Sequence, residues 1–129
     1  MKAVILSGGY GRRLGNITRF TPKSLIKIKN KTLLEWQIIQ LKKFGISELF
    51  LNTHFFHNQF KKIIKKLSYL RVKINLKYQK KLNGTAGAVK IFDKKLVKEK
   101  YFFLIYGDIL FKENHRNLLN FHKSRKSSI

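Results

Sequence analysis

The apolar residues 3–6 and the glycine-rich segment that follows them constrain the fold of this chain more than any other feature. A short, continuous apolar run is typical of a strand that is buried on both faces of a parallel sheet. The next segment, residues 8–14 (GGYGRRL), is rich in glycine and arginine. Glycines allow backbone N–H groups to come close to a ligand, and guanidinium groups bind phosphate oxygens. The pattern therefore predicts a phosphate cradle at the carboxyl end of a sheet strand.

Strand and helix patterns alternate along the chain. Strands are expected at residues 3–6, 48–52, 72–79 and 101–106, and helices at residues 32–44, 60–67, 84–93 and from 114 onward. Such alternation predicts an α/β fold with a Rossmann-like parallel sheet and helices on both faces. Right-handed crossovers favour the strand order 3-2-1-4. A chain of 129 residues forms one domain at most.

Individual elements carry further local signals. Thr32 and Glu35 form a capping-box pattern at the start of the first helix, and Gly45 is placed to end it. Apolar and polar residues alternate at residues 72–79, which predicts a half-exposed strand at a sheet edge. Residues 101–106 are all apolar or aromatic and predict a buried strand. Residues 7–31 show no regular pattern, and a loop of this length is usually functional.

Net charge is the most unusual property of the composition. The chain has 29 lysines and arginines against six aspartates and glutamates, a formal net charge of +23. A surface this basic attracts polyanions such as nucleic acid, but the lysines are spread over every expected element, which favours a solvated surface. The chain has no cysteine, and no apolar run reaches the ~18 residues of a membrane span. A signal peptide would need a longer apolar stretch at the N-terminus, so a cytoplasmic location is expected.

The glycine-rich loop does not match two well-known phosphate-binding motifs. A P-loop needs Gly-Lys-Ser/Thr at a set spacing, and no such triplet follows. A dinucleotide fingerprint needs a third glycine where this chain has Leu14, and an acid after the second strand, which ends in Asn52 and Thr53. The same long loop continues to Lys23, which Pro22 presents from a stiffened backbone for contact with a phosphate.

Asp108 is the most informative of the six carboxylates. It follows the apolar run 101–106 through Gly107, whereas the other acids fall on expected helix or loop surfaces. Ligands of α/β folds bind at the carboxyl ends of sheet strands. A carboxylate at that position, facing cations and phosphates, suits Mg²⁺, which takes one or two carboxylates together with phosphate oxygens and water. A turn or helix-capping aspartate is the alternative.

Small residues at 84–88 (GTAGA) open the third expected helix. They allow a base or ribose to lie against the backbone, and they equally suit packing of a helix on the sheet. His54 and His57 lack the carboxylate neighbours of a metal site. Neither they nor His115 and His122 are assigned a role.

Together these motifs resemble the sugar nucleotidyltransferases, also called NDP-sugar pyrophosphorylases. The family's signature loop, G-G-x-G-T-R-L…T…P-K-x-L, is similar to residues 8–14 followed by Thr18 and residues 22–25. Gln79 with residues 84–88 looks like the family's base-recognition strand and helix start. Gly107 and Asp108 resemble the pair whose aspartate holds Mg²⁺. The resemblance covers nearly the whole chain.

The resemblance implies a nucleotide-diphospho-sugar transferase fold and a sugar-1-phosphate nucleotidyltransferase activity. In that reaction a sugar 1-phosphate attacks the α-phosphorus of a nucleoside triphosphate and yields an NDP-sugar and pyrophosphate. By the same resemblance Arg13 stabilises the leaving pyrophosphate, Lys23 contacts the phosphates and Asp108 binds the Mg²⁺ cofactor, and these are the expected catalytic residues. The expected nucleotide contacts are Leu6, Ser7, Gly8, Gly9, Gly11, Arg12, Arg13, Lys23, Gln79, Gly84 and Thr85.

The resemblance also points to a substrate. Residues 84–87 look most like the guanylyl-transferring, mannose-1-phosphate branch, which favours GTP. Residues 52–54, however, also occur in related uridylyltransferases. The expected partners are the NTP and a sugar 1-phosphate. No membrane is expected, nucleic acid is not favoured, and a homo-oligomer is left open.

Two departures from the family pattern matter. Arg12 stands where threonine or serine is usual. Family members also continue past this length, so residues 1–129 are expected to be the nucleotide-binding half of the domain, truncated before the sugar-binding half. Two alternatives stay open: a non-catalytic module that binds nucleotide-sugar, and a basic nucleic-acid-binding domain.

Overall fold

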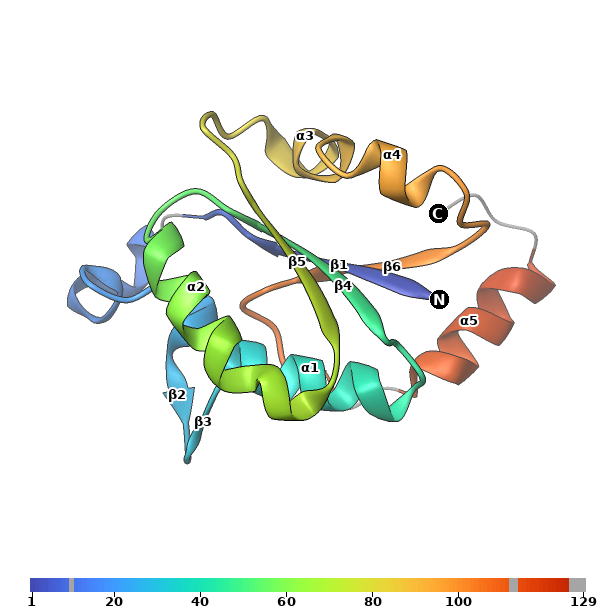
Figure 1. Ribbon diagram of the computed structural model, residues 1–129, viewed down its shortest axis with the longest axis horizontal. Coiled ribbons are helices and arrows are strands. Elements are labelled where there is room, and N and C mark those ends of the chain that lie inside the picture. The colour runs from blue at the N-terminus through green and yellow to red at the C-terminus, as the bar shows by residue number, and fades with distance from the viewer. Residues whose placement is uncertain (10, 112–113, 126–129) are drawn as a thin grey trace.

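A central sheet of four parallel strands organises the computed structural model, which describes residues 1–9, 11–111 and 114–125 (Figure 1). The strands are β1 (Lys2–Ser7), β4 (Glu48–Thr53), β5 (Lys73–Tyr78) and β6 (Phe102–Tyr106). Their spatial order is β5-β4-β1-β6, which is the predicted order 3-2-1-4. Every neighbouring pair is parallel, so the carboxyl ends of all the strands lie along one edge of the sheet.

Helices cover both faces of the sheet, which confirms the predicted α/β class. The helices α1 (Leu33–Lys43) and α2 (His57–Lys66) lie on one face, and α3 (Gly84–Lys90) and α4 (Asp93–Leu96) lie on the other (Figure 1). The 3₁₀ helix η3 (Leu67–Leu70) follows α2, and α5 (His115–Ser124) follows β6. In the described part of the chain, no helix combines the length and the apolar character needed to cross a membrane.

The helix expected at residues 84–93 is divided into α3 and α4. Phe92 turns inward between them and is 5% exposed. Its ring packs on Phe50 of β4, with 5.2 Å between the ring centroids. The backbone leaves the helical conformation at Phe92, with φ −111° and ψ 8°, so one continuous helix does not form.

Residues 7–31 contain short elements that the sequence analysis did not predict. The segments η1 (Arg12–Thr18) and η2 (Lys23–Leu25) are 3₁₀ helices. The strands β2 (Lys27–Ile28) and β3 (Lys31–Thr32) pair as a small antiparallel hairpin. Elements this short leave no periodic pattern of apolar residues, which is why the segment looked irregular.

The boundaries of α1 confirm the capping signals. The Thr32 hydroxyl accepts a hydrogen bond from the Glu35 backbone N–H at 3.1 Å. Gly45 follows the helix with a left-handed φ of 80°, a conformation that glycine adopts without steric cost. The Glu35 carboxylate is engaged by the Tyr69 hydroxyl at 2.6 Å and by Lys31 Nζ at 3.1 Å. These hydrogen bonds raise the pKa of Lys31 and the pKa of Tyr69.

Alternate residues of β1 face two hydrophobic clusters. Ala3 and Ile5 pack on the side of α1 and α2. Val4 packs with Phe50 and Phe92 on the side of α3 and α4. The side chains of Ala3, Val4 and Ile5 are completely buried, which confirms the doubly buried strand that the apolar run predicts.

The fourth strand, β6, departs from its prediction. Phe103 and Ile105 pack into the cluster on the α1 and α2 side of the sheet. On the other face, Phe102, Leu104 and Tyr106 are 36%, 42% and 51% exposed. The expectation of a buried strand is wrong for this face. The reason is that β6 is an edge strand, while the cluster formed with α3 and α4 covers β1 and β4. At the opposite edge, β5 is the half-exposed strand that the alternating pattern predicts.

Candidate functional site

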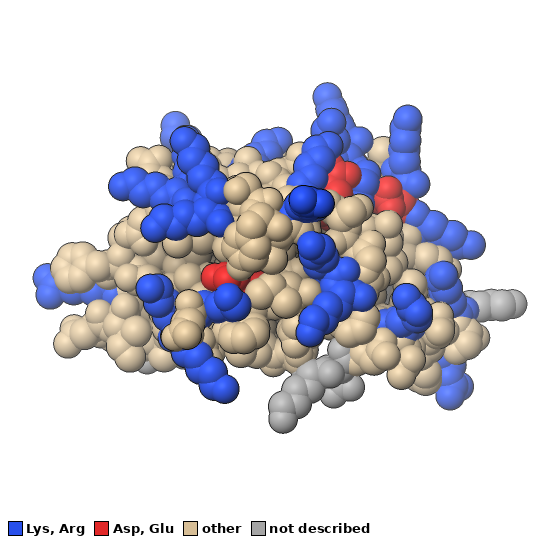
Figure 2. Space-filling view, turned by 60° about the horizontal axis from the view of Figure 1, so that its bottom comes forward, with Lys and Arg blue, Asp and Glu red and all other residues tan. Residues whose placement is uncertain are grey.

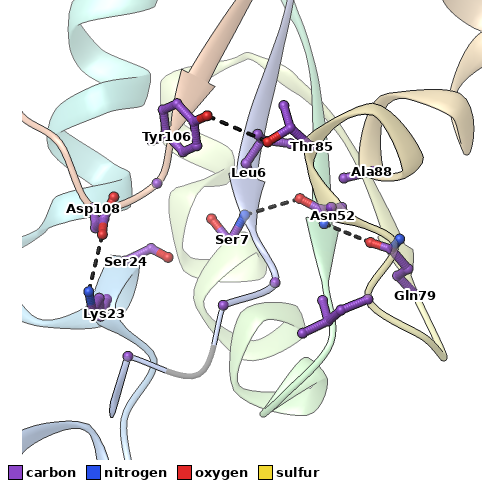
Figure 3. A pocket seen from close by; sticks show the side chains of 16 residues that line it. Leu6, Ser7, Lys23, Ser24, Asn52, Gln79, Thr85, Ala88, Tyr106 and Asp108 are labelled. Carbon is purple, nitrogen blue, oxygen red and sulfur yellow. Dashed lines mark hydrogen bonds and ion pairs between the residues drawn. The ribbon is translucent and has the colours of Figure 1, made fainter. Parts of the chain in front are cut away.

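The carboxyl ends of the sheet strands surround a cavity of about 300 Å³ (Figure 3). This volume lies at the lower end of the ~300–1,000 Å³ range of small-molecule sites. Every predicted site residue whose side chain is described lines the cavity: Leu6, Ser7, Gly8, Gly9, Gly11, Lys23, Gln79, Gly84, Thr85 and Asp108. The remaining lining residues are Ser24, Asn52, Leu82, Ala88, Tyr106 and Gly107. The fold thus brings the glycine loop, the loop lysine and the acid after β6 to one place.

The backbone of Arg12 and Arg13 opens η1. Their side chains, and the whole of Tyr10, lie outside the part of the chain that the structure describes. The phosphate contacts expected of Arg12 and Arg13 therefore stay predictions.

Two glycines of the loop, Gly11 and Gly9, have different surroundings. Gly11 has a φ of 71°, and a Cβ there would lie 2.9 Å from Lys23 Cγ and 3.0 Å from Thr18 Cγ2. Both its backbone conformation and its packing therefore favour glycine. At Gly9 a Cβ would meet none of the described atoms within 4 Å, and φ is outside the left-handed region. The absence of a side chain at Gly9 keeps space open beside the backbone, which is what a closely bound ligand requires.

Lys23 and Asp108 meet at one end of the cavity (Figure 3). Lys23 Nζ lies 3.2 Å from Asp108 Oδ2, and the two side chains are 26% and 43% exposed. Lys23 opens η2 directly behind Pro22, whose φ of −58° and ψ of 145° fix the direction of the chain. An ion pair as exposed as this one contributes only ~0–1 kcal/mol. Either group can therefore exchange its partner for a ligand at small cost.

The turn that presents the acid of this pair is held by α1. The fully buried Gln37 donates through Nε2 to the carbonyl oxygens of Tyr106 at 2.8 Å and Ile109 at 2.6 Å. Further along α1, Gln40 Nε2 donates to the carbonyl oxygen of Phe111 at 2.7 Å. The acceptors come before and after Asp108 in the sequence, so these hydrogen bonds fix the turn that carries Asp108 relative to α1.

Gly107 allows this turn to pass close to β1. A Cβ at Gly107 would lie 2.8 Å from the Leu6 carbonyl oxygen and would touch Ser7 Oγ. The Gly107 backbone N–H donates to the same Leu6 carbonyl at 2.8 Å. Glycine is needed here for space, because any side chain would push the acid-bearing turn away from the sheet.

Buried amides connect neighbouring strands at the other end of the cavity (Figure 3). Asn52 Oδ1 accepts a hydrogen bond from the Ser7 backbone N–H at 3.1 Å, and Asn52 Nδ2 donates to Gln79 Oε1 at 3.0 Å. Among the residues that the structure describes, Gln79 Nε2 has no hydrogen-bond partner. A buried donor without a partner costs about 1–3 kcal/mol, so this group favours a ligand that carries an acceptor.

The start of α3 forms a wall of the cavity near these amides. Gly84 has a left-handed φ of 67°, and Thr85 Oγ1 lies 3.5 Å from the Tyr106 hydroxyl oxygen. Leu82 and Ala88 add apolar surface. The small residues expected to contact a base or ribose therefore lie where a flat apolar group can enter.

Asp108 is the lining residue that suits a metal ion. In the described ranges, no three His, Cys, Asp or Glu side chains gather into a metal-binding group. Mg²⁺ does not need such a group, because it takes one or two carboxylates and completes its shell with phosphate oxygens and water. The half-exposed Asp108 carboxylate beside the cation of Lys23 fits that donor set, provided that a phosphate ligand brings the remaining oxygens.

Six lining residues were not among the predicted site residues: Ser24, Asn52, Leu82, Ala88, Tyr106 and Gly107. Of these, Ala88 and Gly107 belong to the motifs at residues 84–88 and 107–108. Asn52 and Tyr106 lie at the carboxyl ends of β4 and β6, and that position alone could have identified them. Ser24 and Leu82 lie in connecting segments and carry no comparable signal.

The basic residues and the histidines do not concentrate at the cavity. Figure 2 shows Lys and Arg side chains spread over the displayed face instead of gathered in one patch. His115 is buried and stacks on Phe44, with 4.8 Å between ring centroids. Burial and the charge of Lys61 lower the pKa of His57. The described lining of the cavity contains no histidine, in keeping with the sequence analysis.

The chain is similar to known nucleotidyltransferases in sequence. It is 31% identical over 125 residues to "Mannose-1-phosphate guanyltransferase beta-B" of Xenopus laevis, which covers 95% of this chain and 35% of the relative. It is 32% identical over 129 residues to "D-glycero-alpha-D-manno-heptose 1-phosphate guanylyltransferase" of Aneurinibacillus thermoaerophilus, which covers 100% of this chain and 55% of the relative. The chain therefore spans between about a third and about half of the length of these relatives.

Solved structures show the same fold. HddC from Yersinia pseudotuberculosis, in complex with GMP-PN, matches with a TM-score of 0.80 and 22% identity, over 94% of this chain and 53% of that chain. A UDP-glucose pyrophosphorylase in complex with UDP-glucose matches with a TM-score of 0.75 and 17% identity, over 97% of this chain and 54% of that chain. Residues 2–129 also match the sequence model of the family described as "Nucleotidyl transferase". The chain therefore belongs to the nucleotidyl transferase family.

Proposed function

We propose that this chain binds the nucleoside triphosphate and the metal ion for nucleotidyl transfer to a sugar 1-phosphate. The observation that carries the proposal is the convergence of Gly9, Gly11, Lys23, Gln79 and Asp108 on one cavity at the carboxyl edge of the sheet. The names of two relatives, both guanylyltransferases of sugar 1-phosphates, support the same reaction class. The products of the proposed reaction are an NDP-sugar and pyrophosphate.

In this reaction a phosphate oxygen of the sugar 1-phosphate attacks the α-phosphorus of the NTP. The bond between the α-phosphorus and the oxygen that leads to the β-phosphorus breaks, and pyrophosphate leaves with that oxygen. Transfer of this kind depends on positioning and on neutralising phosphate charge. The protein therefore needs donors and cations around the phosphates, and it needs no covalent nucleophile.

The residues at the Lys23 end of the cavity supply these groups. The open space beside Gly9 allows phosphate oxygens to reach the backbone N–H groups of the loop. Lys23 exchanges its Asp108 partner for a phosphate oxygen and neutralises charge there. Asp108 is then free to hold Mg²⁺, which when bound neutralises and polarises the phosphate oxygens. Gln37 and Gln40 keep the turn that presents Asp108 in place.

GTP is the nucleotide that we propose as substrate, with a sugar 1-phosphate as acceptor. The two guanylyltransferase relatives support this choice, and so does the likeness of residues 84–87 to the guanylyl branch. We propose that residues 1–129 supply the nucleotide-binding half of the activity. The expected cytoplasmic location and a homo-oligomer stay predictions.

The experiment that tests the proposal is calorimetric titration of the chain with GTP and Mg²⁺. Lys23→Ala is expected to weaken binding by at least ~10-fold, the loss of one charge-assisted hydrogen bond. Lys27→Ala is the matched control, because Lys27 is an exposed lysine of β2 outside the cavity and its loss removes the same charge. Absence of GTP binding, or an equal loss in both variants, would contradict the proposal.

A measurement of pyrophosphate release distinguishes a catalytic chain from a non-catalytic binding module. The chain is incubated with GTP, Mg²⁺ and mannose 1-phosphate, and pyrophosphate is measured. Release that depends on mannose 1-phosphate supports transfer by this chain. GTP binding without release favours the module that binds nucleotide without turnover.

The net charge of +23 favours a second candidate function, which is binding of nucleic acid. Such binding would weaken steeply as salt rises. It would also leave GTP binding unaffected, because the basic side chains are spread over the surface and not confined to the cavity (Figure 2). A competition titration, which measures whether an oligonucleotide displaces GTP, tests whether the two ligands bind at different places.

A further inference from the structure

We propose that Asn52 sets the hydrogen-bond polarity of the cavity at its Gln79 end and thereby selects nucleotides whose base presents a carbonyl group there. Guanine, uracil and thymine carry such a group, whereas adenine and cytosine carry an amino group at the equivalent edge. The inference rests on the proposed nucleotide-binding function. Asn52 is a positioning residue in this account, because it acts on the base through Gln79.

The polarity begins at a group that can only donate. The Ser7 backbone N–H has no acceptor capacity, so Asn52 must turn its Oδ1 toward it, at 3.1 Å. Asn52 Nδ2 then faces Gln79, which must present Oε1 in return, at 3.0 Å. The group of Gln79 that remains is the Nε2 donor. The orientation of both amides is therefore fixed before any ligand arrives (Figure 3).

Burial makes this orientation selective. Asn52 is 2% exposed and Gln79 is 5% exposed, so water does not readily replace the partners of the two amides. The backbone of Gln79 is also held, because its N–H donates to the Thr53 carbonyl at 2.7 Å and its carbonyl accepts from His54 Nδ1 at 2.6 Å. A carbonyl oxygen of the base satisfies the buried Nε2 donor. An amino group in the same place opposes a donor to a donor and leaves both unsatisfied.

Two pairs of nucleotides exchange the carbonyl group for an amino group on the same ring, together with the hydrogen on the adjacent ring nitrogen. ITP and ATP share a purine ring and carry a carbonyl and an amino group, respectively, and UTP and CTP form the same pair on a pyrimidine. Each is titrated into the chain with Mg²⁺. The wild type is expected to bind ITP over ATP, and UTP over CTP, by at least ~10-fold.

Asn52→Asp reverses the polarity with almost no change of shape. The introduced carboxylate still accepts from Ser7 N–H, but it now also accepts from Gln79 Nε2, and Gln79 Oε1 is left as the free group. The titrations are run at about pH 8, because a high pH favours the ionised carboxylate. The preference for the carbonyl-bearing nucleotide is expected to fall below ~2-fold or to reverse. A merely structural role would weaken both members of a pair equally and leave the ratio unchanged.

Two further variants complete the experiment. Asn83→Asp adds the same charge at an exposed residue beside α3 that makes no contact in the Ser7–Asn52–Gln79 hydrogen-bond chain. It is expected to leave the ITP/ATP and UTP/CTP affinity ratios as in the wild type. Gln79→Glu presents an acceptor directly and is expected to reverse the preference, which keeps the test decisive if Asn52→Asp does not fold. Equal binding within both pairs by the wild type, or ratios unchanged in Asn52→Asp and Gln79→Glu, would overturn the inference while leaving the proposed function intact. A wild type that binds none of the four nucleotides would also overturn the inference, and only a failure to bind GTP as well would overturn the proposed function.

Discussion

Lys23 Nζ lies 3.2 Å from Asp108 Oδ2, although 85 residues separate the two along the chain. The pair joins the loop after β1 to the turn after β6, at the edge where adjacent parallel strands end. Because the pair is partly exposed, it adds little stability by itself. In the proposed function, the pair supplies a cation for a phosphate and, beside it, a carboxylate for the metal ion.

Asp108→Asn is expected to separate metal-dependent from metal-independent nucleotide binding. Without Mg²⁺ the variant should bind GTP at least as well as the wild type, because a repelling charge is removed and Lys23 is released. With Mg²⁺ the wild type should gain ~10-fold or more in affinity and the variant should gain little. Calorimetric titration with and without Mg²⁺ measures both values. An equal gain from Mg²⁺ in both proteins would place the metal elsewhere.

Alanine substitutions at two glycines of the cavity are expected to have different consequences. Gly9→Ala should leave the free energy of unfolding unchanged, because its Cβ would meet none of the described atoms within 4 Å, yet it should weaken GTP binding by ~10-fold or more. Gly107→Ala should lower the free energy of unfolding by about 1–3 kcal/mol, because its Cβ overlaps β1. Urea denaturation and GTP titration of both variants check the contrast. A large loss of stability in Gly9→Ala would show that Gly9 serves the fold instead.

Gln37→Leu is expected to loosen the turn that carries Asp108. The substitution keeps the volume of the side chain but leaves the carbonyl oxygens of Tyr106 and Ile109 without their donor. We expect a loss of about 1–3 kcal/mol of stability and a smaller gain in GTP affinity on addition of Mg²⁺. Leu41→Val, a conservative change at a buried residue on the same helix, controls for stability alone. A Mg²⁺ gain that equals the wild-type gain would assign Gln37 a structural role only.

Glu48 gives the stability a defined dependence on pH. A hydrogen bond from Lys73 Nζ, at 3.0 Å, holds the pKa of Glu48 below its usual value of 4.5. The unfolded chain therefore takes up the proton at a higher pH than the folded chain. The stabilisation is complete above about pH 4.5 and is lost as the pH falls below it, through the lowered pKa of the folded state.

The variant Glu48→Gln tests this dependence. At neutral pH it should be less stable than the wild type by about 1 kcal/mol, and the difference should shrink as the pH falls below about 4.5. Denaturation at a series of pH values measures the difference. GTP binding should be unchanged at neutral pH, because Glu48 begins β4 and lies at the opposite end of the strand from the cavity. A constant difference at all pH values would rule out titration of Glu48 as the cause.

The strand order and the sheet edge that carries the cavity could be predicted from the order of the elements and from local signals. The alternation of strands and helices with right-handed crossovers predicted the order 3-2-1-4, and glycine-containing segments mark where β1 and β6 end. Since parallel strands end at the same edge, Lys23 and Asp108 could be placed together without coordinates.

Other features depend on contacts that a single sequence does not display. The apolar run of β6 predicts burial on both faces, but the exposure of Leu104 depends on where α3 and α4 pack. Asn52 forms hydrogen bonds with Ser7 and Gln79, which lie on two other segments. The residues next to Asn52 in the sequence give no sign of these contacts. Gln37 looks like an ordinary helix residue until the turn after β6 packs against it.

The shared site for nucleotide and metal is tested most directly by NMR of the ¹⁵N-labelled chain with GTP and Mn²⁺, whose unpaired electrons broaden the signals of nearby amides. The account predicts that the amides of Gly9, Gly11 and Asp108 broaden together at low Mn²⁺, while those of α2 keep their intensity, and that Mg²⁺ with GTP causes no broadening. Broadening that is confined to lysine-rich helices such as α2, with Gly9 and Asp108 unaffected, would contradict it.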